Sequence, residues 1–180
     1  AFLDLEMTGL NVEKHEILEI GLVLARHLPD KDGNFGNDME ILAEREWKVK
    51  PEHIETADPA ALAVNQYQEK NWAEAIDLKQ ALSELSELTH EAILVGHNVA
   101  FDFLFLEKGF LTTDVPNTMH YHKMDTLSLA YAVLYRNPDL LKFSLRELCL
   151  HFGIHNIHAH TALSDAKATF ELYKKLLPSF

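Results

Sequence analysis

The chain has 180 residues, 47% of them hydrophobic and 24% charged, which is typical of one soluble globular domain. A formal net charge of −12 argues against a broad, non-specific grip on long nucleic acid, although a small site can still hold a polyanion through metal ions. No apolar run reaches the roughly 18 residues of a membrane span, and no basic-then-apolar leader opens the sequence. With a single cysteine, Cys149, in an apolar helix, these features predict a cytoplasmic protein without membrane contact.

The first ten residues alternate apolar and polar side chains and break at Gly9, which predicts a strand that runs into a tight turn. On such a strand Asp4 and Glu6 share one face, while Leu3 and Leu5 point into a core. Neighbouring carboxylates repel each other unless a cation lies between them, and oxygen ligands favour Mg²⁺ or Mn²⁺. A solvated strand edge is the alternative interpretation.

The middle of the chain predicts an α/β protein with a mixed sheet. Two further strands, over residues 16–26 and 41–49, flank a turn over 31–37 and extend an antiparallel meander. Glu19 in the first of them either supports the site or is exposed. The other predicted elements are a helix over 60–67 capped by Asp58, an amphipathic helix over 75–90, a buried parallel strand over 92–95, a strand that ends near 126, and helices over 98–108, 126–135, 144–152 and 161–177.

Asp102 is the third candidate carboxylate. With Asn98 as the N-cap, Asp102 falls one turn into a helix that is apolar almost all round, so we expect the helix to be buried. An ionised carboxylate in that position needs a partner or a metal ion, because burying it alone is very costly. The helix also follows a parallel strand, where α/β sheets tend to place their sites.

The last predicted helix carries Asp165. At about 100° per residue, Asp165 falls on the line of Leu172 and Leu176, a stripe that should face the core. A favourable contact with the helix dipole is the weaker interpretation. His160, five residues earlier, lies before the predicted cap and is a natural general base, although His155 and His158 compete by proximity.

Four carboxylates from three elements thus converge with one histidine. Such a cluster can hold two cations roughly 3.5–4 Å apart, the arrangement that serves phosphodiester displacement. One cation would lower the pKa of an attacking water, the other would stabilise the leaving oxygen, and the histidine would accept a proton. These patterns indicate phosphoryl chemistry. They do not indicate the direction of cleavage along a strand or the substrate.

Three motifs in this order resemble those of the DnaQ-like, or DEDDh, 3′–5′ exonucleases: Asp4-x-Glu6-x-Thr8-Gly9, His97-Asn98-x-x-Phe101-Asp102 and His160-x-x-x-x-Asp165. The resemblance runs from residue 3 to about residue 176. The first motif is similar to that of oligoribonucleases, and the later ones to those of proofreading subunits. It implies a ribonuclease H-like fold with a mixed five-stranded sheet, in a single exonuclease domain over residues 1–180.

The resemblance also implies an activity, the release of 5′-mononucleotides from the 3′ end of single-stranded DNA or RNA. Two Mg²⁺ or Mn²⁺ ions would bind Asp4, Glu6, Asp102 and Asp165, with His160 as general base. The substrate would meet the backbone around Met7 and Thr8, with Asn98 and Phe101 beside the scissile end and Asp125 in support. Asn65, with Gln66, stands where proofreading members often have His-Gly and is a further candidate contact.

The expected partners are short oligonucleotides, or DNA to which a polymerase delivers the protein as a subunit, and a homodimer is a further possibility. The alternative to an enzyme is a non-catalytic exonuclease-like module that binds nucleic acid or protein. Loss of a ligand or of the histidine would favour that alternative, but all five positions are filled.

Overall fold

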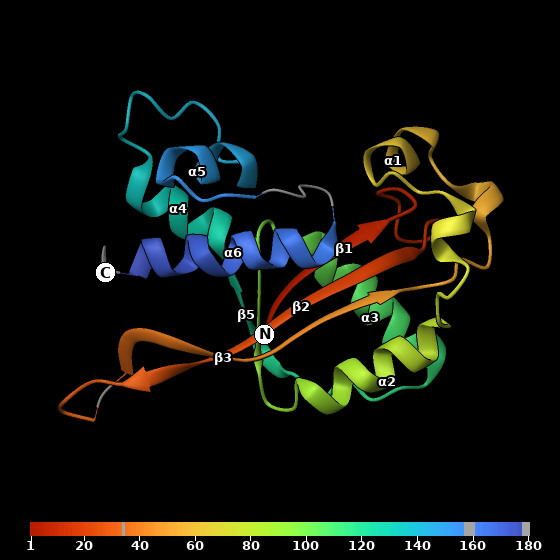
Figure 1. The fold of residues 1–180 in the computed structure, drawn as a ribbon, viewed down its shortest axis with the longest axis horizontal. Coiled ribbons are helices and arrows are strands. Elements are labelled where there is room, and N and C mark those ends of the chain that lie inside the picture. The colour runs from red at the N-terminus through yellow and green to blue at the C-terminus, as the bar shows by residue number, and fades with distance from the viewer. Residues whose placement is uncertain (34, 157–160, 178–180) are drawn as a thin grey trace.

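A computed structural model describes residues 1–33, 35–156 and 161–177. Within these residues, strands form one five-stranded sheet in the spatial order β3-β2-β1-β4-β5 (Figure 1). The strands are β1 (Phe2–Met7), β2 (Ile17–Pro29), β3 (Phe35–Lys48), β4 (Ile93–Gly96) and β5 (His120–Asp125). The first three strands pair antiparallel, whereas β4 pairs parallel with β1 and β5. The mixed five-stranded sheet predicted from the sequence is therefore confirmed.

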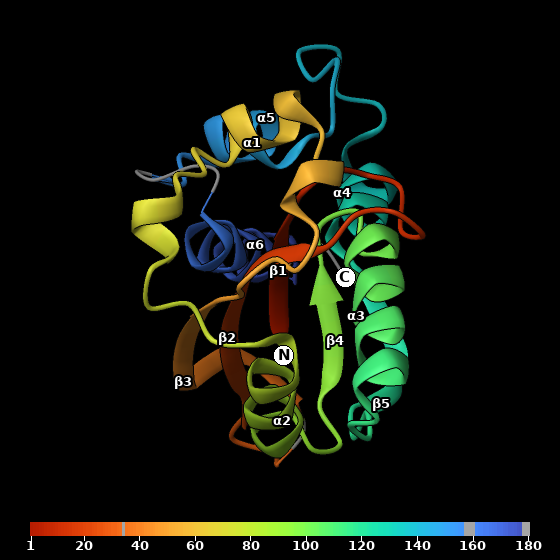
Figure 2. The same ribbon diagram turned by 90° about the vertical axis from the view of Figure 1, so that its right-hand side faces the viewer.

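Helices cover both faces of this sheet (Figures 1 and 2). On one face lie α2 (Leu78–Leu88) and α3 (Ala100–Thr113); on the other lies α6 (Ala162–Leu176), with α4 (Thr126–Leu134) and α5 (Leu145–Phe152) packed against it. Beyond the end of β1 lie α1 (Pro59–Val64) and two 3-10 helices, η1 (Ile54–Thr56) and η2 (Glu69–Trp72). Among the described residues, no helix is long and apolar enough to cross a membrane.

The alternation along β1 divides its side chains between the two faces. Leu3 and Leu5 are buried in the core that contains α2 and α3. Phe2 points the other way, with its ring centroid 5.1 Å from that of Phe170 on α6. Because side chains two apart on a strand share a face, Asp4 and Glu6 lie on the α6 side. The first strand thus presents both carboxylates to the N-terminal half of α6.

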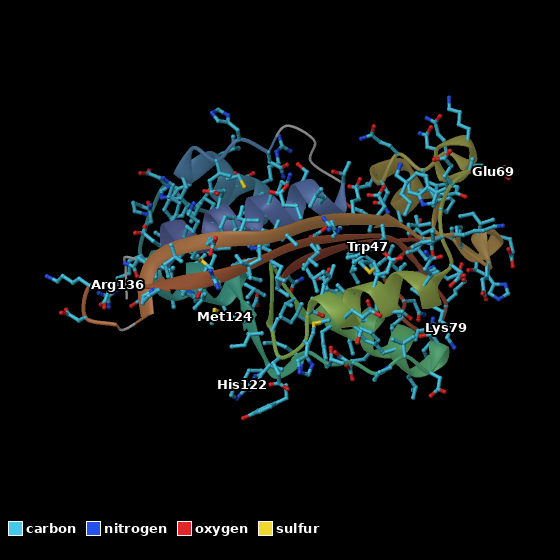
Figure 3. All side chains as sticks on the ribbon, turned by 60° about the horizontal axis from the view of Figure 1, so that its bottom comes forward. Trp47, Glu69, Lys79, His122, Met124 and Arg136 are labelled. Atoms are coloured by element: carbon cyan, nitrogen blue, oxygen red, sulfur yellow. The ribbon has the colours of Figure 1, made fainter. Side chains whose placement is uncertain are left out.

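The α2 side of the sheet is closed by apolar packing and by one polar contact. Trp47, near the end of β3, lies between the sheet and α2 (Figure 3). Its indole Nε1–H donates to Oε2 of Glu84 over 2.7 Å, which satisfies the only polar atom of a buried ring. Asp77 caps α2 by accepting from the Gln80 N–H at 2.8 Å. This helix therefore begins later than the predicted residue 75.

The predicted helix start at α1 is confirmed, whereas some boundaries move. Asp58 accepts from the Ala60 N–H at 2.8 Å and Pro59 is the first helical residue, but the helix ends at Val64 and not near residue 67. Strand β3 begins at Phe35, so the predicted turn over 31–37 is shorter. The difference arises because the ladder between β2 and β3 continues past the Gly- and Asn-rich residues to the Pro29–Phe35 pair.

The start of α3 differs from the prediction. Val99 occupies the N-cap position, and Asn98 lies before it with φ +61°, a left-handed conformation that asparagine tolerates. Asn98 is therefore not the cap. Its N–H instead donates to Oδ1 of Asp125 at 2.8 Å, so the residue joins the end of β4 to the end of β5.

The expectation that α3 is buried on all sides is also wrong. Phe105 and Phe110 are buried against the sheet and α2, but Phe101, Leu104 and Leu111 are exposed. The helix is apolar all round in composition, yet it lies at the outside of the fold and packs through one face only. Composition alone therefore overstates its burial.

Candidate active site

Three of the four candidate carboxylates come together between β1 and α6. Asp4, Glu6 and Asp165 each offer an oxygen, and these oxygens all lie within 4.8 Å of one another. The first two follow from the strand alternation, and Asp165 projects from the first turn of α6. Leu172 and Leu176, on the same helical line, are fully buried, as predicted. The structure thus joins residues about 160 positions apart in one acidic cluster.

Burial and mutual repulsion make this cluster costly when all its members are ionised. Burial, followed by the charges of Asp102, Asp165 and Glu6, raises the pKa of Asp4 well above its ordinary value. Burial, followed by the charge of Asp165, raises the pKa of Glu6 to about 8. A divalent cation would remove both penalties, because it attracts every carboxylate and replaces the lost water. Oxygen-only donors at this density fit Mg²⁺ or Mn²⁺.

Asp102 flanks the cluster and does not belong to the set of three. It is buried in the first turn of α3, where its Oδ1 accepts a hydrogen bond from the Leu5 N–H at 3.0 Å. Burial raises its pKa to about 7, and the Leu5 N–H opposes that shift. Among the neighbouring charges, that of Asp102 raises the pKa of Asp4 most, so the fourth carboxylate acts on the same cluster.

Glu19 on β2 is buried, so the exposed alternative is wrong. Its Oε2 accepts from the Ala162 N–H at 3.3 Å, and its Oε1 lies 3.9 Å from Nζ of Lys48. Ala162 is the first residue of α6, whose free N–H groups attract a carboxylate. Burial raises the pKa of Glu19, and the bond from Ala162 opposes that shift. Glu19 therefore links the start of α6, the helix that carries Asp165, to the sheet.

Gly21, two residues further along β2, permits this close approach. A Cβ at position 21 would overlap the backbone of Ala162 and Leu163. Gly21 also pairs with Asp4 across the β1–β2 ladder. The absence of a side chain at this position therefore lets the start of α6 lie directly over the residue opposite Asp4, which brings Asp165 to the cluster.

One residue of the site was not predicted from the sequence. Asn156 donates from its Nδ2 to Oδ1 of Asp165 at 2.5 Å, and its own Oδ1 accepts from the Ser164 hydroxyl at 2.6 Å. These bonds orient the Asp165 carboxylate. Asn156 lies in an irregular segment, where no periodicity marks a side chain as pointing inward, so its role could not be predicted from the sequence.

The candidate histidines differ in whether the structure describes them. The predicted base, His160, and its competitor His158 lie outside the described residues. His155 is exposed. His97 is held at both ring nitrogens, since Nε2–H donates to the Phe143 carbonyl at 2.9 Å and Nδ1 lies 3.0 Å from the Thr126 hydroxyl oxygen. Burial lowers its pKa, which favours a neutral, structural imidazole.

The backbone groups expected to meet the substrate at the end of β1 already have internal partners. Thr8 is buried, its N–H donates to the Glu16 carbonyl at 2.8 Å, and its hydroxyl oxygen accepts from the Glu16 N–H at 2.9 Å. The Met7 carbonyl accepts from Nδ2 of Asn65 at 2.8 Å. Asn65 thus holds the end of β1 in place. Gln66, the next residue, has φ +53°, in the left-handed region that favours glycine.

The other two predicted contacts are accessible. Asn98 is exposed at the start of α3, and the Phe101 ring, one turn further along, is 39% exposed. Asp125, predicted to be supporting, accepts at Oδ1 from both Asn98 N–H and Leu127 N–H. These three residues form the corner of the fold next to Asp102.

A cavity of about 570 Å³ lies on the α2 and α3 side of the sheet, across β1 from the acidic cluster. Its apolar lining residues include Ile17, Val49, Leu78 and Phe105. Its lining contains equal numbers of lysines and acidic residues: Lys14, Lys50, Lys79 and Lys108, and Glu13, Glu16, Glu52 and Asp77. This balance gives the cavity no preference for a polyanion, so the acidic cluster is the stronger candidate for phosphodiester chemistry.

Comparison with known families agrees with this geometry. The RNase_T family model, described as "Exonuclease", matches residues 1–173. The chain belongs to the DnaQ-like exonuclease family. The family match covers every described carboxylate discussed above.

Relatives of this DnaQ-like exonuclease include polymerase components and a ribonuclease. It is 31% identical to a DNA polymerase III PolC-type from Clostridium perfringens, over 95% of this chain and 11% of that protein. It is 29% identical to DNA polymerase III subunit epsilon from Aquifex aeolicus, over 97% of this chain and 78% of the subunit. It is 28% identical to ribonuclease T from a Shewanella species, over 95% and 78% of the two chains.

Solved structures show the same fold. E. coli exonuclease I in complex with a dA16 oligonucleotide superposes with a TM-score of 0.72 at 18% identity, over 96% of this chain and 39% of that one. The predicted ribonuclease H-like fold is thereby confirmed. The chain spans only about a tenth of the PolC-type polymerases that it matches.

Proposed function

We propose that this protein is a metal-dependent 3′–5′ exonuclease that releases 5′-mononucleotides from single-stranded DNA or RNA. The observation that carries the proposal is the gathering of Asp4, Glu6 and Asp165 oxygens within 4.8 Å, in a chain of the DnaQ-like family. Burial raises the pKa values of Asp4 and Glu6, so this cluster is costly in its ionised form. Bound cations would offset that cost, which supports a function that uses them.

In this proposal Asp4, Glu6, Asp102 and Asp165 hold two Mg²⁺ or Mn²⁺ ions. When bound, such ions lower the pKa of an attacking water and stabilise the leaving 3′ oxygen. Asn156 orients Asp165, and the Leu5 N–H orients Asp102, so that each carboxylate keeps a fixed direction. His160 is the proposed general base, a neutral imidazole that accepts a proton from the water.

The substrate is proposed to approach across the corner formed by Asn98 and Phe101. The exposed Phe101 ring offers a face for the terminal base, as aromatic side chains do in other single-strand binding sites. A substrate contact with the backbone around Met7 stays a prediction, and the Met7 carbonyl is already held by Asn65. Thr8 and Asn65 keep the end of β1 in place for that contact.

The family context suggests two sources of single-stranded 3′ ends. An epsilon subunit and PolC-type polymerases among the relatives favour a polymerase partner that delivers DNA, and ribonuclease T favours RNA. The net charge of −12 favours short oligonucleotides when the protein acts alone. A homodimer stays a prediction.

Matched 5′-labelled DNA and RNA oligomers, from dinucleotides to long single strands, test the proposal in the presence of Mn²⁺ or EDTA. We expect a ladder that shortens from the 3′ end only when metal is present. Absence of cleavage while Mn²⁺ still binds would contradict the proposal and favour the non-catalytic binding module. His160→Ala should lower turnover and leave Mn²⁺ affinity unchanged; loss of the metal would make His160 a ligand and not a base.

A further inference from the structure

An aromatic face of α4 is left open to solvent. Ser128, Tyr131, Ala132 and Tyr135 are exposed at helical spacings of three and four, so they share one side of the helix and its C-cap. Tyr131 is 59% exposed and Tyr135 is 53% exposed. Their ring centroids lie 6.1 Å apart, about one helical turn. Large rings this exposed contribute little to the core.

This face starts at the corner that carries the proposed substrate contacts. The Ser128 hydroxyl donates to Oδ2 of Asp125 at 3.0 Å, and Oδ1 of Asp125 accepts from the Asn98 N–H at 2.8 Å. Tyr131 then lies one turn further along α4, and Tyr135 two turns further. The exposed rings therefore lie on a continuous surface that leads away from Asn98.

A second connection runs through Phe143. Its carbonyl accepts from Nε2–H of His97, the residue before Asn98, and its ring packs edge-on against Tyr131 with centroids 5.2 Å apart. The segment between α4 and α5 lies at the top of the molecule beside α5 (Figures 1 and 2). The position of Tyr131 is thus coupled to the residues that begin α3.

The segment that follows this face carries a small excess of positive charge, which suits a polyanion. The Arg136 guanidinium lies 5.2 Å from the Tyr135 ring centroid, and Lys142 is exposed in the same connecting segment. Among the described residues neither cation forms an ion pair. Asp139 is the opposing acid of this segment, whose charge is still positive against a total of −12.

We propose that Tyr131 and Tyr135, with Arg136, form a base-stacking platform for single-stranded nucleic acid, on the 5′ side of the nucleotide that is removed. This inference rests on the proposed exonuclease function. Stacking on tyrosine needs bases that are not paired in a duplex, and it tolerates any base because each has a π-face. Arg136 adds a cation beside the same ring and can neutralise a phosphate.

The test compares two substrates on one enzyme. A dinucleotide ends before the platform, whereas a single strand of about twelve nucleotides crosses it. Tyr131→Ala with Tyr135→Ala should lower kcat/KM for the long strand about tenfold or more, mainly through KM, and leave the dinucleotide rate within about twofold. Tyr131→Phe with Tyr135→Phe keeps both rings and should behave as the wild type. Tyr121→Ala, at a 75% exposed tyrosine on β5, is the matched control.

A long strand with abasic sites upstream of its terminal nucleotide separates base stacking from other causes. On this abasic strand, kcat/KM of the wild type should fall to the value that the double alanine variant shows on the normal strand. The abasic sites should not lower kcat/KM of the variant any further. Equal kcat/KM of wild type and double variant on the long strand, or a loss that does not depend on the bases, would overturn the platform. A wild type that cleaves neither substrate would instead overturn the exonuclease function itself.

Discussion

The Leu5 N–H donates to Oδ1 of Asp102 over 3.0 Å and joins residues 97 positions apart in the chain. The bond forms where the β1–β4 pairing has already ended, since the two strands pair at Phe2 and Val95. The first turn of α3 therefore takes the place of a neighbouring strand. Asp4 and Glu6, on either side of Leu5, are held in a fixed position relative to Asp102.

The contribution of this hydrogen bond to stability can be separated experimentally from the contribution of the Asp102 charge to turnover. Asp102→Asn keeps an oxygen that accepts from Leu5, whereas Asp102→Ala leaves a buried N–H without a partner, at a cost of about 1–3 kcal/mol in unfolding free energy. We expect both variants to lose turnover, and only the alanine variant to unfold at clearly lower urea concentration in EDTA. Equal urea midpoints of the two variants would show that the bond adds nothing to stability.

Gly21 should control metal binding from outside the cluster. Gly21→Ala forces the start of α6 away from β2, so that Asp165 moves away from Asp4, and overpacking lowers the unfolding free energy by about 1–3 kcal/mol. The rise in melting temperature on addition of Mn²⁺ should become smaller. Leu24→Ala on the same strand is the control, since it weakens the core and should leave the Mn²⁺-induced rise intact.

The raised pKa values predict how stability changes with pH. Glu6 and Asp102 have pKa values of about 8 and about 7 in the folded protein, against 4.5 and 3.8 ordinarily. The folded state binds more protons between these values, so the contribution of the cluster to stability is greatest below about pH 4 and is lost as pH rises through about 7 to 8.

Scanning calorimetry in EDTA at about pH 5.5 and about pH 8.5 measures this contribution. Mn²⁺ competes with protons for the same oxygens, so the Mn²⁺-induced rise in melting temperature should be larger at the higher pH. A rise that is larger at the lower pH would mean that the metal binds elsewhere.

Asp165→Asn should abolish turnover with little effect on folding. The amide keeps the size of the side chain but removes one charge from the cluster, and a loss of about two to three orders of magnitude is expected for one electrostatic stabiliser. In EDTA the variant should be as stable as the wild type or more so, because repulsion on Asp4 and Glu6 falls. Glu171→Gln, on the same helix and paired with Lys174, is the control. Turnover retained by Asp165→Asn would remove Asp165 from the site.

Periodicity predicted the parts of the site that depend on local geometry. The alternation along β1 placed Asp4 and Glu6 on one face, and the helical line of Leu172 turned Asp165 inward. Both inferences need only the repeat of a strand or a helix. The cap of α1 at Asp58 was predictable for the same reason, since the residues that form it are adjacent.

Features that depend on contacts between distant elements could not be predicted. The sequence left two alternatives open for Glu19, because its role depends on the start of α6, 143 residues away, and the role of Asn156 depends on an irregular segment. The exposure of Leu104 and Leu111 depends on the place of α3 at the outside of the fold. In each case the partner is chosen by tertiary packing, which local pattern does not encode.

The proposed exonuclease function requires that the carboxylate cluster hold the cations that support cleavage. A Mn²⁺ titration of wild type and Asp165→Asn, with free Mn²⁺ followed by electron paramagnetic resonance and mononucleotide release followed in the same samples, tests it directly. We predict that release rises in step with Mn²⁺ occupancy in the wild type, and that the variant loses both. Release in metal-free protein, or unchanged Mn²⁺ occupancy in the variant, would show that the cluster does not hold the catalytic cations.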